Sequence, residues 1–246
     1  ATLAVLYARA ATRAPDGMRL KHFVPFYERA VDDLPAEADM EAAVRDMASE
    51  LTALAAAAFG IFLFAAYQLN MLAFVLAPVA AAYLVFYPFT KRFTWTANLL
   101  LGWALAISPT AAWIGVTGSL SPEPVLISLA VALWAGSFDI LYHTQDYEFQ
   151  RENGLHSVAA RFGVLNAFRI ARTLDVLAVV CLITLWVWMG LGWPFLAACG
   201  IASCILWYKY RLVSPDDLSK MGMAFGRINA FVSTTMLVGT IVAISI

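Results

Sequence analysis

The sequence predicts an all-α, polytopic membrane protein with about seven transmembrane spans in one helical bundle. Of its 246 residues, 62% are hydrophobic and 13% are charged, whereas ordinary soluble domains carry about 25% charged residues. The mean hydropathy is +0.74. So little polar surface could not cover a soluble globule, and the lipid bilayer is the expected surrounding. The formal net charge of -1 also argues against nucleic acid as a partner, because phosphate binding requires concentrated basic residues.

Seven apolar runs approach the ~20 residues that a helix needs to cross a bilayer. In chain order these runs are residues 51–69, 71–89, 96–116, 125–142, 174–191, 193–208 and 228–246. Small residues and prolines recur inside them, among them Gly102, Gly200 and Pro78. This composition is typical of helices that pack closely in lipid. We therefore expect the seven spans to form one bundle.

The basic residues predict which side of the membrane each connection faces, because cytoplasmic loops collect Lys and Arg. All 16 basic residues lie before the first span, between the second and third, between the fourth and fifth, or between the sixth and seventh. The remaining connections carry none. The N-terminus is therefore expected in the cytoplasm.

Residues 1–48 differ in composition and are predicted to be a polar cytoplasmic leader, with the membrane domain in residues 49–246. The leader holds six of the 16 basic and eight of the 17 acidic residues. Over residues 39–54, apolar side chains recur at helical spacing, as with Met40, Val44 and Met47. This pattern predicts a surface helix that leads into the first span.

Asp139 is the strongest candidate for a functional residue, because ionisable groups near bilayer depth are costly, at least ~2.5 kcal/mol, and usually functional. It ends an apolar run. A helix continuing past it would place Tyr142, Asp146 and Gln150 within about 60° of it on one face. Paired carboxylates suit Mg²⁺ together with substrate phosphate oxygens. Helix capping, or pairing with Lys and Arg at the interface, explains the same spacing equally well.

A second cluster lies at the inner end of the second span. Tyr87 and Lys91 are four residues apart and share a helix face if the last turn accommodates Pro88. Lys91, Arg92 and Arg161 fall on the same predicted side as Asp139, where they would offset the charge of a diphosphate. Ordinary interfacial anchoring by tyrosine and basic residues is the alternative interpretation.

Three blocks of sequence carry a resemblance to a known family. They are YPFTKRFTW at residues 87–95, SFDILYHTQD at residues 137–146 and GLHSVAARFG at residues 154–163. In this order and spacing they resemble the UbiA superfamily of intramembrane aromatic prenyltransferases, which contains 4-hydroxybenzoate polyprenyltransferase. The resemblance extends from about residue 51 to the C-terminus.

The resemblance implies a UbiA-like bundle in a bacterial-type inner membrane. It also implies Mg²⁺-dependent transfer of a polyprenyl group from an isoprenyl diphosphate to an aromatic acid acceptor, such as 4-hydroxybenzoate, in ubiquinone or menaquinone biosynthesis. The residues that it assigns to catalysis are Asp139, Tyr142, Asp146 and Tyr87; those that it assigns to substrate binding are Lys91, Arg92, Arg161 and His156; and those that it assigns to the metal are Asp139 and Asp146.

The sequence departs from the family pattern in two places. Gln150 stands where many members have a further acidic residue. The first of the family's two Asp-rich motifs, of the Asn-Asp-x-x-Asp-x-x-x-Asp type, has no counterpart, and residues 1–48 contain neither of the two spans expected ahead of residue 51. A truncated or frame-shifted reading frame and a divergent member are both open. So is a non-catalytic UbiA-like membrane protein.

An ion-coupled transporter that uses Asp139 and Asp175 within the membrane is a further alternative. Transporters often contain internal repeats, and no repeat is evident in this sequence. Asp175 lies three residues after Arg172, so a local pair between these two side chains is expected near the interface.

Overall fold

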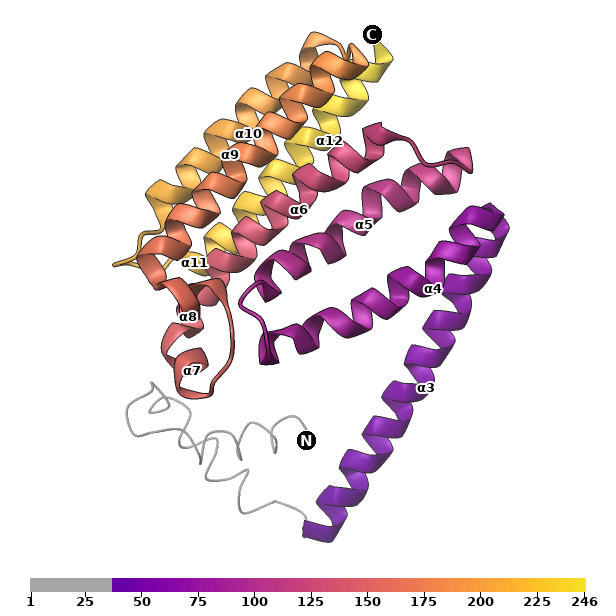
Figure 1. Cartoon of the computed structure of the whole chain (residues 1–246), viewed down its shortest axis with the longest axis vertical. Helices are drawn as coiled ribbons and strands as arrows, with labels where there is room; N and C mark the ends of the chain where they lie inside the picture. Colours follow the sequence, from indigo (N-terminus) through magenta and orange to yellow (C-terminus); the bar gives the residue numbers. More distant parts are fainter. Residues whose placement is uncertain (1–36) are drawn as a thin grey trace. The chain divides into compact units, whose positions relative to one another are not determined.

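The computed structural model describes residues 37–246, with side chains from Val44 onward, and every regular element in this part is a helix. The chain divides into two units between Phe62 and Leu63. Most of the predicted leader lies outside the described residues. The elements (Figure 1) are α3 (Glu37–Leu69), α4 (Met71–Phe86), η2 (Tyr87–Arg92), α5 (Ala97–Thr117), α6 (Pro122–Tyr142), η3 (His143–Asp146), α7 (Tyr147–Glu152), α8 (Val158–Phe162), α9 (Val164–Met189), α10 (Trp193–Leu212), α11 (Met221–Met223), η4 (Ala224–Ile228) and α12 (Asn229–Ser245).

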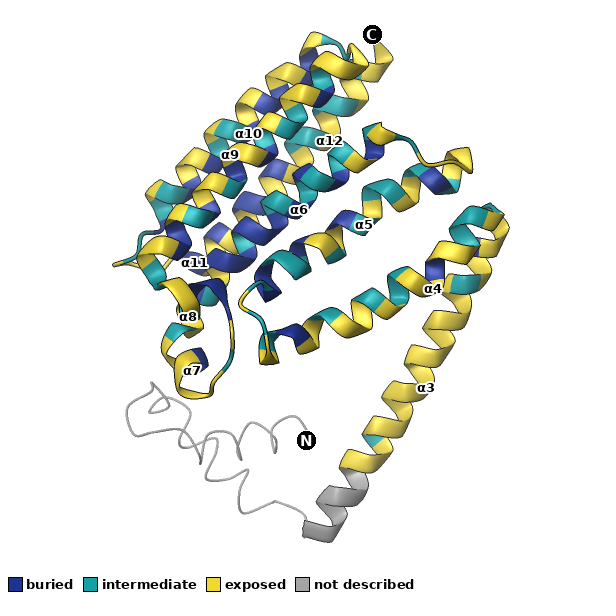
Figure 2. Ribbon diagram, viewed as in Figure 1, coloured by how far each residue is buried: buried dark blue, intermediate teal, exposed yellow. Residues whose placement is uncertain are grey.

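The first unit is described from Glu37, where α3 begins. The helix expected over residues 39–54 is part of α3, which continues without a break into the first predicted span. From Val44 to Phe62 nearly every side chain is exposed (Figure 2). Most of these exposed side chains after Thr52 are apolar, as expected of a helix that faces lipid.

Within the described part of the chain, six helices are long and apolar enough to cross a membrane, and they correspond to six of the seven predicted spans. The remaining predicted span forms α10, which is 20 residues long. Tyr208, Lys209 and Arg211 near its C-terminal end lower its hydropathy, so α10 is not among the six. The helix α9 begins at Val164 rather than at residue 174, because hydropathy marks only the apolar part of a helix.

The pair α5 and α6 is held at close distance by glycine. A Cβ atom on Gly102 of α5 would collide with the carbonyl oxygen of Ala132 and would lie 2.9 Å from the amide nitrogen of Gly136, both in α6. Farther along the same pair, the hydroxyls of Thr110 and Ser128 lie 2.7 Å apart and form a hydrogen bond. Small residues at such contacts replace the hydrophobic driving force that lipid removes.

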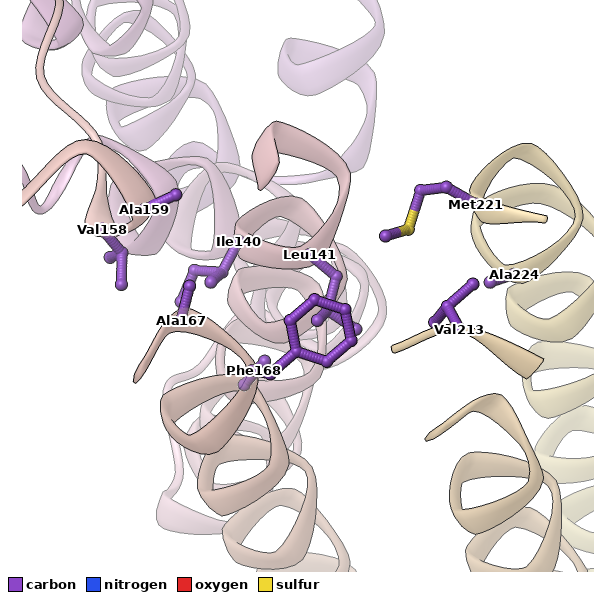
Figure 3. Packing of buried hydrophobic residues seen from close by; sticks show 10 residues of the cluster. Ile140, Leu141, Val158, Ala159, Ala167, Phe168, Val213, Met221 and Ala224 are labelled. Carbon is purple, nitrogen blue, oxygen red and sulfur yellow. The ribbon is translucent and has the colours of Figure 1, made fainter. Parts of the chain in front are cut away.

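A compact apolar core closes the end of the second unit where α6 meets α8 (Figure 3). Ile140 and Leu141 of α6 are fully buried there against Phe168 of α9. The other labelled side chains of this core are Val158, Ala159, Ala167, Val213, Met221 and Ala224. Because Asp139 immediately precedes Ile140, this core anchors the turn of α6 that carries Asp139.

We expect the substitution Gly102→Ala to lower the stability of the second unit by about 1–3 kcal/mol, the usual effect of overpacking. Thermal unfolding in detergent would measure it as a lower Tm. The matched control is Gly200→Ala in α10, where an added Cβ meets nothing within 4 Å and alanine favours the helix. Equal Tm values for the two variants would contradict the close contact.

Candidate functional site

Asp139 lies in the last turn of α6 and is only 4% exposed. The Asn98 side-chain amide donates a hydrogen bond to Asp139 Oδ2 over 2.7 Å. On the other side, His143 Nδ1 lies 3.3 Å from Asp139 Oδ1 and 2.9 Å from the Asp139 backbone carbonyl oxygen. Buried charged groups require such partners, because burial without them is costly. The carboxylate is therefore held from two elements, α5 and η3.

The second partner, His143, connects Asp139 to Lys91. The Lys91 ammonium nitrogen lies 2.6 Å from His143 Nε2. An ammonium group can only donate, so Nε2 accepts, and the proton of the neutral ring sits on Nδ1, facing Asp139. Lys91 and Asp139 thus lie on opposite sides of one imidazole, although they are far apart in the sequence. Whether they share one diphosphate pocket stays a prediction.

The third sequence block is tied to the other two through main-chain groups. The Val158 amide donates to Asn98 Oδ1 over 3.0 Å, and the His156 amide donates to the Lys91 carbonyl oxygen over 2.8 Å. Ser157 caps α8 by accepting from the Ala160 amide over 3.0 Å. The three blocks singled out in the sequence therefore meet at one end of the bundle. Asn98, which lies outside all three, joins two of them.

Contrary to the prediction from the sequence, the α-helix does not continue unchanged past Tyr142. Residues 143–146 form the 3₁₀ segment η3, which turns about 20° more per residue than an α-helix, or about 80° over four residues. Asp146 is accordingly exposed, whereas Asp139 is buried. Gln150 is also buried, and its Oε1 has no hydrogen-bond partner among the described residues.

The other predicted site residues surround this network at its surface. Tyr87 is half-buried at the start of η2. The Arg92, Arg161 and His156 side chains are exposed, and the Arg92 guanidinium lies 5.7 Å from the centre of the Phe89 ring. Among the side chains that the structure describes, from residue 44 to 246, no group of three or more His, Cys, Asp or Glu is placed to hold a metal ion.

A row of aromatic rings extends from Tyr142 into the bundle. The Tyr142 and Phe225 rings have centres 4.6 Å apart, Phe225 and Phe138 lie at 5.4 Å, and Phe138 and Trp134 lie at 5.3 Å. Phe225, Phe138 and Trp134 line a cavity of about 500 Å³ that also contacts α5 at Leu105. Tyr142 itself is 39% exposed. The row therefore connects the surface beside η3 with an apolar cavity.

The predicted local pair between Arg172 and Asp175 is wrong. Asp175 Oδ2 instead accepts from the Lys209 ammonium and from the Tyr210 hydroxyl, each over 2.6 Å. Lys209 is 1% exposed, and Ser137 of α6 lies 3.4 Å from its nitrogen. Because α10 runs antiparallel beside α9, Lys209 reaches Asp175 inside the bundle. The Arg172 guanidinium lies over the Tyr210 ring, 4.9 Å from its centre.

Comparison with known proteins adds an independent finding. Residues 38–235 match the profile of the UbiA prenyltransferase family. The chain is 31% identical over 195 residues to a 4-hydroxybenzoate octaprenyltransferase of Cupriavidus necator. The aligned region covers 78% of this chain and 66% of that protein. It is 30% identical over 162 residues to the protein of the same name from Methylobacillus flagellatus, covering 64% of this chain and 53% of that protein.

The chain thus spans between about half and two thirds of the length of these curated relatives. A solved structure is also similar: the apo form of a UbiA homolog from Aeropyrum pernix, with a TM-score of 0.71 and 27% sequence identity. The similarity covers 79% of this chain and 72% of that chain.

The Asn98 amide offers a direct test of the network. We expect Asn98→Ala to lower the free energy of unfolding by roughly 2–4 kcal/mol, because it leaves both Asp139 Oδ2 and the Val158 amide without this partner. Asn166→Ala is the control, since its exposed side chain bonds only to the nearby Phe162 carbonyl at the end of α8 and to Arg169 in its own helix. Denaturant unfolding in mixed micelles would measure both. A loss no larger than that of the control would show that the Asn98 contacts do not stabilise the fold.

The Lys209–Asp175 pair predicts a non-additive result. Lys209→Met leaves a buried carboxylate without its cation, which should cost about 3–5 kcal/mol. The double variant with Asp175→Leu removes both charges and should recover much of that loss. Additive losses in a double-mutant cycle of unfolding free energies would count against a coupled pair.

Proposed function

Because the chain belongs to the UbiA prenyltransferase family, we propose that it transfers a polyprenyl group from an isoprenyl diphosphate to an aromatic acid acceptor, such as 4-hydroxybenzoate, in quinone biosynthesis. Two of its relatives carry the name 4-hydroxybenzoate octaprenyltransferase. The observation that best supports the proposal is the buried Asp139 carboxylate, held by Asn98 and His143 where the three family-like blocks meet.

The chain is an integral membrane protein with a helical bundle. We propose that it lies in a bacterial-type inner membrane with its N-terminus in the cytoplasm, as the positions of the basic residues favour. We also keep the division into a leader, residues 1–48, and a membrane domain, residues 49–246, as a proposal. The proposed site then faces the cytoplasm, where isoprenyl diphosphates are water-exposed at their charged end.

Mg²⁺ is the cofactor that the proposed chemistry implies. The carboxylates suit a site in which the ion is also bound by water and substrate oxygens, rather than by the protein alone. Among the described residues, the polar side-chain contact of Asp139 Oδ1 is the 3.3 Å approach of His143, so lone pairs remain for a cation. Asp146 is exposed to solvent. Mg²⁺ commonly binds one or two carboxylates together with waters and substrate phosphates, so we propose Asp139 and Asp146 as its ligands. Bound there, the ion would supply charge neutralisation to the departing diphosphate.

The chain's own residues would contribute charge and shielding. In the proposed reaction the allylic carbon–oxygen bond breaks, diphosphate leaves with the electron pair, a ring carbon of the acceptor bonds to the allylic carbon, and the ring then loses a proton. Lys91, Arg92 and Arg161 would offset the growing charge on the diphosphate; His156 would help to bind it. Phe138 and the catalytic tyrosines Tyr142 and Tyr87 would present aromatic faces to the allylic cation.

The proposal is tested first by binding. We expect the chain in detergent to bind a non-hydrolysable allylic thiodiphosphate in the presence of Mg²⁺ and to lose this binding in EDTA. Asp139→Asn and Asp146→Asn should each weaken binding about tenfold or more, because each removes a negative charge beside the cation. Asp216→Asn, an exposed residue of the α10–α11 connection, is the matched control and should bind as the unsubstituted chain does.

On the same samples, turnover is measured as the amount of prenylated 4-hydroxybenzoate that forms. Product that requires Mg²⁺ and Asp139 would support the enzyme. Mg²⁺-dependent binding without any product would instead favour the non-catalytic alternative. Binding that is indifferent to Mg²⁺ and to both aspartates would overturn the proposed metal site.

A further inference from the structure

A groove between α9 and α10 lies apart from the proposed catalytic network. The two helices lie side by side (Figure 1), and a cavity of about 590 Å³ opens between them. Its polar end is formed by Arg172, Asp175, Tyr210 and Arg211. Its other end is apolar and is formed mainly by three valines of α9 and by Leu206 of α10. A cavity with one charged end and one apolar end is suited to an amphipathic ligand.

The polar end contains an acceptor that is not satisfied. Asp175 is 4% exposed, and its Oδ2 accepts from Lys209 and Tyr210. Its Oδ1 is buried and has no hydrogen-bond partner within the part of the chain that the structure describes. Buried polar atoms in native proteins nearly always have a partner. Asp175 lines the cavity, so a ligand bound there lies beside this carboxylate.

The rim of the same end carries positive charge. The Lys209–Asp175 pair is electrically neutral, so the charges of Arg172 and Arg211 remain. Each guanidinium is seated on an aromatic ring: Arg172 lies 4.9 Å from the centre of the Tyr210 ring, and Arg211 lies 4.8 Å from that of Trp207. Guanidinium groups bind phosphate through paired hydrogen bonds, and stacking limits their freedom. The rim therefore favours a phosphate group.

We infer that this groove binds an anionic phospholipid whose head group carries a free hydroxyl, as phosphatidylglycerol does. The phosphate binds Arg172 and Arg211, the head-group hydroxyl donates to Asp175 Oδ1, and the first methylenes of an acyl chain cover the valines of α9. A hydroxyl is favoured over an ammonium as the donor, because Lys209 already neutralises Asp175 and an added cation would be repelled by both arginines. This inference does not depend on the proposed function.

A lipid series tests the head group on the unaltered full chain. Lipid binding would be titrated in detergent by native mass spectrometry. We expect phosphatidylglycerol to bind about tenfold more tightly than phosphatidylmethanol, which has the same charge but no hydroxyl, because one hydrogen bond to a charged acceptor is lost. Phosphatidylcholine and phosphatidylethanolamine should bind more weakly than phosphatidylglycerol. Equal affinity across the series, or a preference for phosphatidylethanolamine, would overturn the assignment.

Substitutions at the rim of the groove test whether the lipid binds there. Arg172→Gln and Arg211→Gln should each weaken phosphatidylglycerol binding about tenfold, as expected when one charged phosphate contact is removed. Arg169→Gln is the matched control, because Arg169 is exposed on α9 but does not line the cavity. Unchanged affinity in both rim variants would overturn the proposal. Equal affinity for soluble glycerol phosphate and for phosphatidylglycerol would also overturn the proposal, because the acyl chain would then contribute nothing to binding.

Discussion

Polar groups inside an apolar bundle must find their partners within the protein, because lipid offers them none. One amide, that of Asn98, meets this requirement for two elements: it donates to Asp139 and accepts from the Val158 amide. Without Asn98, the buried carboxylate would keep only its contact with His143, and α8 would lose its hydrogen bond to α5. The position of Asp139, and with it the proposed chemistry, therefore depends on a residue that binds no substrate in the proposed reaction.

The two buried carboxylates of the bundle are satisfied to different degrees. Asp139 has contacts on both oxygens, whereas Asp175 has two strong donors on Oδ2 and, among the described residues, no hydrogen-bond partner for Oδ1. The first arrangement fixes a carboxylate whose Oδ1 keeps lone pairs for the proposed cation. In the second arrangement Oδ1 is the acceptor that we assign to the head-group hydroxyl of the lipid. The same physical requirement thus gives the bundle a rigid site in one place and a selective groove in another.

The sequence predicted the helices well, because apolar runs mark the segments that lie in lipid and basic residues mark the connections between them. It also identified the blocks that meet around Asp139. It did not single out Asn98 or His143, although a polar residue inside an apolar run, as Asn98 is, was a usable signal. The sequence did not predict the η3 segment, because an argument from helical periodicity assumes the same number of residues per turn along the whole helix. Lys209 was assigned to a loop because its pairing with Asp175 joins residues 34 positions apart, which no local pattern reveals.

The contacts of Asn98 also bear on how the protein is made. Its two partners, Asp139 and Val158, follow it by 41 and 60 residues, so both reach the membrane after Asn98 does. Until then its amide must be hydrated or held by the insertion machinery, because an unsatisfied polar group in hydrocarbon costs several kcal/mol. The final docking of α5 is consequently a late event of biogenesis. It waits until α8 has left the ribosome.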